Sequence, residues 1–291
     1  MNKLIAELQR LYFLQDQQWQ SHERGEGGVI SDGVLAQSFA GELNVALNLL
    51  GLDGQVRAMV LCFDRAADWE RVAQLYQVVE ETLELPAPAI SVSAESGYKL
   101  WLSLAESVPL AQAQTFLQGL CRTALVDLPI SHFKLCPGAG EALDAESCLL
   151  DLAPALHPSS GKWSAFIDPA MGSMFVEAPG LEMAPNMDRQ ADILSRLKSI
   201  KTIDFQRALS QLKQQIEEQA QLVEAVENER RQINLKSGVE ADSTSSMLNL
   251  GSTFSDPKSF LLAVMNDSSA TASQRIEAAK ALLPYFENHQ V

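Results

Sequence analysis

The chain has 291 residues, and its 22 Lys and Arg against 37 Asp and Glu give a formal net charge of −15. This excess of acid argues against broad electrostatic binding to DNA, which requires basic patches, although a few converging Lys and Arg residues could still form a local site. No apolar run is long enough to span a bilayer, and the N-terminal stretch has the pattern of an amphipathic helix instead of a signal peptide. We therefore expect a cytoplasmic protein without a membrane partner.

Residues 1–52 are predicted to form an N-terminal helical segment. Apolar residues at helical spacing indicate a first helix over about 2–20, which is followed by the glycine-rich break GEGG. A second helix is expected at roughly 33–50, where Gly51 supplies a natural C-terminal glycine.

Residues 53–200 are predicted to form an α/β (α+β) domain. The apolar run at 57–63 is typical of a buried strand, and apolar residues at helical spacing indicate a helix over 69–83. Strands are expected at 89–93 and 98–104, joined by the turn AESG. A helical crossover followed by a hairpin implies a mixed sheet with packed helices, in which these three strands are neighbours.

Further elements complete the predicted domain. A helix is expected with Ser107 as its cap and Pro109 at its first position. The segments 132–136 and 163–167 have the composition of strands, and a loop and a helix are expected over 180–198.

A different pattern begins after residue 200, where a long heptad-patterned helix is predicted over 201–235. Its apolar seam consists of Phe205, Leu209, Leu212, Ile216, Val223, Val226 and Ile233. Gln219 and Arg230 interrupt the seam. The stripe predicts a homo-oligomer formed through the 202–233 helix as a coiled coil, and the alternative is a helix packed on the α/β domain of its own chain.

The C-terminal end is predicted to contain a flexible linker over 236–255 and a small helical hairpin over 256–291. Asp256 is placed to cap the first helix of the hairpin, and Thr271 with Gln274 forms a capping-box pattern for the second.

Candidate anion-binding residues cluster where the first two strands end. Asp64 follows the buried strand, a position that α/β domains commonly use for function, and Arg65 comes next. The turn at Ser96 and Gly97 could present backbone N–H groups and a hydroxyl to an anion, and Lys99 could bring charge to the same edge. Each residue also has a structural interpretation: Asp64 as a helix cap, Ser96-Gly97 as a hairpin turn and Lys99 as a solvated strand residue.

A zinc site is a separate possibility. The chain contains four cysteines and no CxxC pair. His132, Cys136, Cys148 and His157 lie within 26 residues and could form a Cys2His2 set. The alternative is a set of buried thiols in a reducing compartment, because Cys148 stands in an apolar run.

The sequence of 56–122 resembles the archaeo-eukaryotic primase superfamily, the primase–polymerases of plasmids and phages. The resemblance is carried by LCFD, a helix, PAISVSAESGYKLWLSL and then PLAQAQTFLQGL. In that family an acidic motif ends one strand, a Ser-Gly turn leads into a strand bearing a histidine, and a third carboxylate comes later. The family's acids hold two divalent metals for nucleotidyl transfer, and its histidine contacts a nucleotide phosphate. Asp64 matches one acid of the first motif, and SGYKLW at 96–101 matches the second, where relatives read Ser-Gly-Tyr-His-Leu-Trp.

The sequence departs from this family pattern at several positions. The first motif normally has two acids one residue apart, but here position 62 is cysteine and position 66 is alanine. Lys99 replaces the histidine, and Asp151 and Asp168 are both candidates for the later acid. If the protein were catalytic, Mg²⁺ or Mn²⁺ would be the cofactor, with Asp64 and Asp168 as ligands. A single acid in the first motif cannot hold two metal ions about 4 Å apart, so the resemblance implies a degenerate relative that has lost part of the family's motifs.

The segment 256–285 resembles a stretch of the small terminase subunits of phages, and its alternative interpretation is an ordinary helical hairpin.

Three functions are consistent with these sequence features. The first is a non-catalytic primase–polymerase-like protein in nucleic-acid transactions of a mobile genetic element (phage, prophage or plasmid), with a nucleic acid or nucleotide as partner. The second is an acidic protein-interaction scaffold with a self-associating helix, and the third is an active metal-dependent nucleotidyltransferase.

Overall fold

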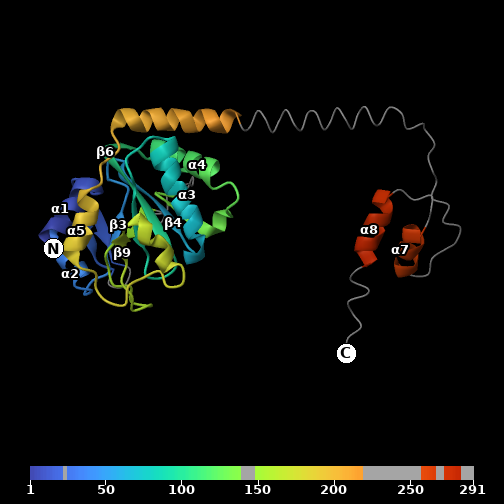
Figure 1. Cartoon of the computed structure of the whole chain (residues 1–291), viewed down its shortest axis with the longest axis horizontal. Helices are drawn as coiled ribbons and strands as arrows, with labels where there is room; N and C mark the ends of the chain where they lie inside the picture. The colour runs from blue at the N-terminus through green and yellow to red at the C-terminus, as the bar shows by residue number, and fades with distance from the viewer. Residues whose placement is uncertain (22–24, 139–147, 219–256, 267–271, 283–291) are drawn as a thin grey trace. The chain divides into compact units, whose positions relative to one another are not determined.

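The computed structural model describes residues 1–21, 25–138, 148–218, 257–266 and 272–282 (Figure 1). The chain divides into two compact units, residues 1–222 and 223–291. No helix among the described residues has the length and apolar character that crossing a bilayer requires.

The first unit contains two sheets. The five-stranded sheet has the order β7 (Phe133–Cys136), β4 (Gln55–Phe63), β6 (Tyr98–Pro109), β5 (Ala89–Val92) and β9 (Ala165–Ile167). The four-stranded sheet has the order β2 (Gly27–Val29), β1 (Gln18–Gln20), β3 (Ala46–Asn48) and β8 (Leu149–Asp151). The pairings between these strands are antiparallel, and a parallel element exists only as an isolated bridge between Leu104 and Ile200 among the described residues.

Helices cover the five-stranded sheet on both faces. They are α1 (Asn2–Leu11), α2 (Asp32–Phe39), α3 (Trp69–Gln77, continued by a π-helical turn over Val78–Thr82), α4 (Leu110–Ala124), α5 (Met187–Ser195) and a helix over 202–218. In Figure 1, α3 and α4 lie on one side of β4 and β6, and α1 and α5 lie on the other. Leu61 and Leu100 belong to the core beneath α3 and α4, whereas Val60 and Trp101 belong to the core shared with α1 and the four-stranded sheet. The α+β class is therefore confirmed.

The central prediction about the strands is also confirmed. Strand β6 lies between β4 and β5 and pairs with both, as the expected strand, helix and hairpin order requires. The strands expected at 132–136 and 163–167 and the helix expected within 180–198 are present as β7, β9 and α5.

Two predicted N-terminal helices are wrong in their extent. The first helix ends at Leu11, and Gln18–Gln20 forms β1. The second ends at Phe39, and Gly41 follows with a φ of +76° that favours glycine and stops the helix. Ala46–Asn48 is a strand because it pairs with β1 and β8, and this non-local pairing overrides the local helical pattern.

The predicted cap at Ser107 is wrong as well. Strand β6 continues to Pro109, which pairs with Gln55, and α4 begins only at Leu110. The ladder with β4 therefore extends across the segment that the sequence pattern assigned to the start of the helix.

The 202–218 helix packs within its own chain. Phe205, Leu209 and Leu212 are buried in the core of the first unit, and the Phe205 ring lies 5.2 Å from that of Phe116 on α4. For this part of the seam the structure therefore agrees with the alternative interpretation, in which the helix packs on the α/β domain of its own chain. The rest of the predicted helix, 219–233, lies outside the described residues, and the homo-oligomer stays a prediction that depends on it.

The second unit contains α7 (Pro257–Asn266) and α8 (Ala272–Leu282), which pack against each other. Arg275 Nε donates to the carbonyl oxygen of Met265 at 2.9 Å. The expected pair of C-terminal helices is thus present. The predicted linker at 236–255 and the caps at Asp256 and Thr271 lie outside the described residues.

Candidate functional site

The candidate site lies on the face of the five-stranded sheet that is turned away from α3 and α4. Cys62 on β4 is paired in register with Lys99 on β6 and with Lys134 on β7. Directly opposed residues of antiparallel strands share a face, so the three side chains form a row across the sheet. Phe63, the next residue, belongs to the core beneath the helices, so the row faces the other way. Asp64 follows two residues after Cys62, immediately beyond the end of β4.

Strand β8 of the four-stranded sheet brings Asp151 to Lys99. Lys99 Nζ donates to the Asp151 carbonyl oxygen at 3.2 Å and lies 3.8 Å from its carboxylate Oδ2. The Lys99 side chain is only 12% exposed, whereas that of Asp151 is 60% exposed. Lys99 is therefore a largely covered cation with a solvated partner, and not the fully solvated strand residue of the structural interpretation.

A cavity of about 330 Å³ opens beside this pair. We call it the inter-sheet cleft and define it by Asn44, Ser93, Lys99, Asp151, His157 and Ser164. Its polar lining comes from both sheets and from the loops that flank them, so residues far apart in sequence converge on one small volume.

The Ser-Gly turn joins β5 to β6 and is held by a side chain within the turn. Ser93 Oγ accepts hydrogen bonds from the backbone N–H groups of Ser96 at 2.9 Å and of Gly97 at 2.8 Å. These amides are therefore satisfied within the turn, which agrees with the interpretation of Ser96-Gly97 as a hairpin turn. A Cβ at Gly97 would lie 2.2 Å from the carbonyl oxygen of Phe63, so glycine is required because the turn packs against the end of β4.

The two candidates for a third acid lie in different places. Asp151 joins Lys99 in the inter-sheet cleft. Asp168 instead begins the 3-10 helix Pro169–Phe175, where its carboxylate accepts from the N–H of Ala170 at 3.0 Å. Burial of the phenol and the neighbouring Glu80 raise the pKa of Tyr76 on α3, and the charge of Asp168 adds a smaller increase. Asp168 therefore belongs to the helix-covered side of the sheet.

The first-motif acid, Asp64, does not cap a helix, since the residue before the 3-10 turn Ala66–Asp68 is Arg65. Its carboxylate lies 4.0 Å from the ammonium of Lys134, and its backbone N–H donates to the His132 carbonyl oxygen at 2.9 Å. The guanidinium of Arg65 lies 3.1 Å from His132 Nε2. Asp64 thus has a cation at the outer limit of an ion pair, and Arg65 contacts a ring nitrogen and no carboxylate among the described residues.

A thiol pair is the feature that sequence reasoning missed. Cys62 Sγ and Cys136 Sγ lie 4.0 Å apart, on the paired strands β4 and β7. The hydrogen bond from Cys136 lowers the pKa of the Cys62 thiol, and the charge of Lys99 acts in the same direction against the effect of burial. The same hydrogen bond and burial raise the pKa of Cys136. The two residues are 74 positions apart, so only the strand register could have revealed the pair.

The four residues considered for zinc have separate surroundings. His132 Nδ1 lies 3.2 Å from Asp68 Oδ2, and His157 Nε2 lies 3.3 Å from Glu95 Oε2. Cys136 is engaged with Cys62, and Cys148 is buried. Across the part of the chain that the structure describes, no three His, Cys, Asp or Glu side chains are placed to hold a metal ion.

The residues at the motif positions also do not fit a pair of Mg²⁺ or Mn²⁺ ions. Such ions are held by several carboxylate oxygens, whereas the two carboxylates next to this row, Asp64 and Asp151, each face a lysine. A thiol occupies the position of the second acid, and an ammonium occupies the position of the histidine. The arrangement can bind an anion by exchange of a carboxylate partner, and it lacks the ligands for two-metal chemistry.

No protein-family model matches the chain, and no curated protein matches it. Among solved structures, the archaeo-eukaryotic primase domain of the cyanophage S-2L primase–polymerase is similar. It is 10% identical and has a TM-score of 0.38, over 66% of this chain and 97% of that domain. At this identity and TM-score the similarity assigns neither an activity nor a partner to this chain. Nothing in these comparisons points to a small terminase subunit, so the resemblance of 256–285 has sequence support alone.

Proposed function

We propose that the chain is a non-catalytic, primase–polymerase-like protein that takes part in nucleic-acid transactions of a mobile genetic element. The observation that carries this proposal is the convergence of Cys62, Lys99 and Asp151 beside Asp64. The positions that resemble the family's first two motifs thus meet on one sheet face, but with thiol and ammonium groups where the family has an acid and a histidine.

Lys99 is the residue proposed to contact the partner. Its ammonium is held at 3.8 Å by a carboxylate that remains 60% exposed, and pairs with one solvated member contribute little net stability. A phosphate oxygen of a nucleotide or a nucleic-acid strand can therefore replace the Asp151 carboxylate at low cost. The cationic group then binds the phosphate without help from a metal ion.

Fluorescence anisotropy with a labelled single-stranded oligonucleotide and with a labelled nucleoside triphosphate tests the binding. We expect binding by the full-length chain that does not change with Mg²⁺ or Mn²⁺ and that is weakened in Lys99→Met. Lys3→Met, an exposed lysine on α1, is the matched control and should bind like the unmodified protein. Absence of binding to both ligands would overturn the nucleic-acid role.

The non-catalytic part of the proposal has its own test, a primer-extension assay with Mg²⁺ and with Mn²⁺. We expect no templated or untemplated polymerisation. Metal-dependent extension that disappears in Asp64→Ala would establish the nucleotidyltransferase instead.

A protein-interaction scaffold is the second candidate, and an open apolar pocket beside β7 favours it. Its self-association now depends on Ile216 and on 219–233, because the seam residues Phe205, Leu209 and Leu212 are buried within the chain. Light scattering on the full-length Val223→Asp variant tests this point without removing the 202–218 helix from the core. A fall from an oligomeric to a monomeric mass would support the scaffold, and a monomeric mass for both proteins would refute self-association.

A further inference from the structure

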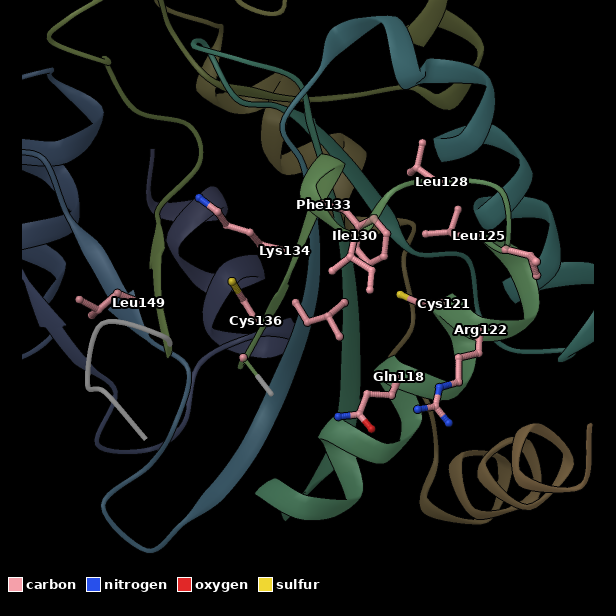
Figure 2. A pocket seen from close by; sticks show the side chains of 13 residues that line it. Gln118, Cys121, Arg122, Leu125, Leu128, Ile130, Phe133, Lys134, Cys136 and Leu149 are labelled. Carbon is pink, nitrogen blue, oxygen red and sulfur yellow. The ribbon is translucent and has the colours of Figure 1, made fainter. Parts of the chain in front are cut away.

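A pocket of about 850 Å³ lies beside β7, the outermost strand of the five-stranded sheet (Figure 2). Leu135 on β7 and Cys121 on α4 line it on the helix-covered side of the sheet. Cys136 on β7 and Leu149 on β8 line it on the other side. Because consecutive residues of β7 contribute, the pocket extends around the strand edge to both faces of the sheet.

Part of the β7 backbone has no partner strand at this edge among the described residues. The Asp64 N–H bonds to the carbonyl of His132, so the even-numbered residues of β7 exchange hydrogen bonds with β4. Leu135 therefore directs its N–H and C=O away from β4, where no strand pairs within the described part of the chain. An unpaired edge of this kind is a template for an added strand.

The helix-covered side of the pocket is apolar. Figure 2 shows the side chains of Leu125, Ile130 and Phe133 gathered between α4 and β7. Ile130 is 84% exposed, so a bulky apolar side chain stands in solvent at the rim. Burying it together with the pocket floor would supply hydrophobic free energy to a partner with apolar side chains.

Two cations flank the apolar surface. Arg122 on α4 is exposed and makes no hydrogen bond or ion pair with another described residue. Lys134 is 75% exposed and has a carboxylate only at 4.0 Å. Two such cations beside one pocket favour acidic groups over basic ones at this position.

We propose that the open edge of β7 binds an extended, acidic segment of a partner protein as an added strand. Side chains of a strand alternate between the two faces, so the partner's apolar residues would enter the side formed by Leu125 and Phe133. Its acidic residues would face Lys134 on the opposite side, and Arg122 would take a carboxylate at the end of the apolar stretch. The main-chain groups of Leu135 fix the register.

The probe is a fluorescein-labelled heptapeptide, Glu-Ile-Glu-Ile-Glu-Ile-Glu, titrated with the full-length protein at low salt and followed by fluorescence anisotropy. We expect saturable binding, and we expect binding roughly tenfold weaker in the double variant Arg122→Glu/Lys134→Glu because both rim charges become repulsive. The matched control is Lys3→Glu/Lys213→Glu, which makes the same change in net charge at exposed sites outside the pocket and should leave the affinity unchanged.

Two further peptides test the strand geometry. A peptide with N-methyl groups on its isoleucines loses backbone donors and should bind more weakly, and a peptide with Lys in place of Glu should not bind. The proposal would be overturned if the acidic peptide did not bind or if the two further peptides bound as tightly as the acidic one. It would also be overturned if the control variant lost as much affinity as Arg122→Glu/Lys134→Glu. Sedimentation showing a dimer that Arg122→Glu/Lys134→Glu dissociates would also overturn it, by assigning the edge to a second copy. The assay contains no nucleotide or metal, so its outcome is independent of the proposed nucleic-acid role.

Discussion

The two faces of the five-stranded sheet differ although the same strands build both. On the face beneath α3 and α4, Leu61 and Leu100 stand opposite each other in a continuous apolar core. In the adjacent pair of the same ladder, Cys62 and Lys99 stand opposite each other next to a polar cleft. Sequence neighbours therefore have different roles: one set packs the sheet against its helices, and the other places a thiol and an ammonium group beside the cleft. Changes to the first face should be felt in stability, and changes to the second in chemistry and binding.

The largest effect is expected at the helix-covered face, in Phe205→Ala. Phe205 is fully buried beside Phe116, and truncation of a buried phenylalanine typically costs about 3–5 kcal/mol of unfolding free energy. Urea denaturation of the full-length protein measures it. The control is Ile203→Ala on the same helix, which is 76% exposed and should cost less than about 0.5 kcal/mol. An equal, small effect for both variants would mean that the helix contributes little to the fold of its own chain.

A large effect on reactivity is expected at the other face, in alkylation by iodoacetamide. A thiol reacts as its thiolate, so a lowered pKa makes Cys62 reactive at lower pH than an ordinary cysteine. Burial raises the pKa of Cys121 to about 12, so its thiolate fraction near pH 8 is on the order of a thousandfold smaller than that of a cysteine with a pKa of about 9. Mass spectrometry after alkylation between pH 7 and 9 should find Cys62 modified and Cys121 unmodified.

The variant Cys136→Ala sharpens this prediction. It removes the hydrogen-bond donor that lowers the pKa of Cys62, so the onset of Cys62 alkylation should move to higher pH. Cys121→Ala, outside the pair, should not move it. Preferential modification of Cys121 in the unmodified protein would contradict the assignment of the reactive thiol.

The fold was predictable from the sequence where local patterns and tertiary packing agree. The runs that became β4, β5 and β6 are short and apolar, and α3 has strong helical spacing, so pattern and structure coincide. The strand β3 could not be predicted, because three residues within an apolar stretch acquire strand geometry only from pairing with β1 and β8. A strand of three residues is too short to show the alternation of apolar and polar residues by which strands are predicted.

The site was only partly predictable for the same reason. The sequence indicated Asp64 and Lys99 as candidates, and it left Asp151 and Asp168 as equal alternatives for the third acid. The structure places Asp151 on β8 next to Lys99, and this contact between the two sheets could not be read from the sequence. The turn at Gly97 stayed open between anion binding and a hairpin turn, because the sequence cannot show that Ser93 already accepts its amides.

A smaller effect on stability is expected for Gly97→Ala, because Gly97 packs against the last residue of β4. A Cβ here would lie 2.2 Å from a backbone oxygen, and the forced shift should cost about 1–3 kcal/mol of unfolding free energy. Gly33→Ala on α2 is the control, because its Cβ would have only Ser31 Oγ nearby, at 3.8 Å. Thermal unfolding should show a lower midpoint for the first variant and an equal or higher one for the second. A neutral Gly97→Ala would mean that the turn does not pack on β4 as described.

The smallest effect on stability is expected for the pair Lys99 and Asp151, although it is the centre of the proposed site. Methionine at position 99 keeps most of the apolar stem of the lysine, so packing against the sheet is preserved, and it removes the charge together with the hydrogen bond to the Asp151 carbonyl oxygen. Asp151 remains 60% exposed and is solvated when its partner is lost. Lys99→Met, Asp151→Asn and the double variant form a cycle whose coupling free energy we expect to lie at about 0–1 kcal/mol, measured by urea denaturation. A weak coupling is what allows a phosphate to replace the carboxylate. A coupling of several kcal/mol would make the pair a structural element that cannot exchange its partner, and the proposed role of Lys99 in binding would fail even with the fold intact.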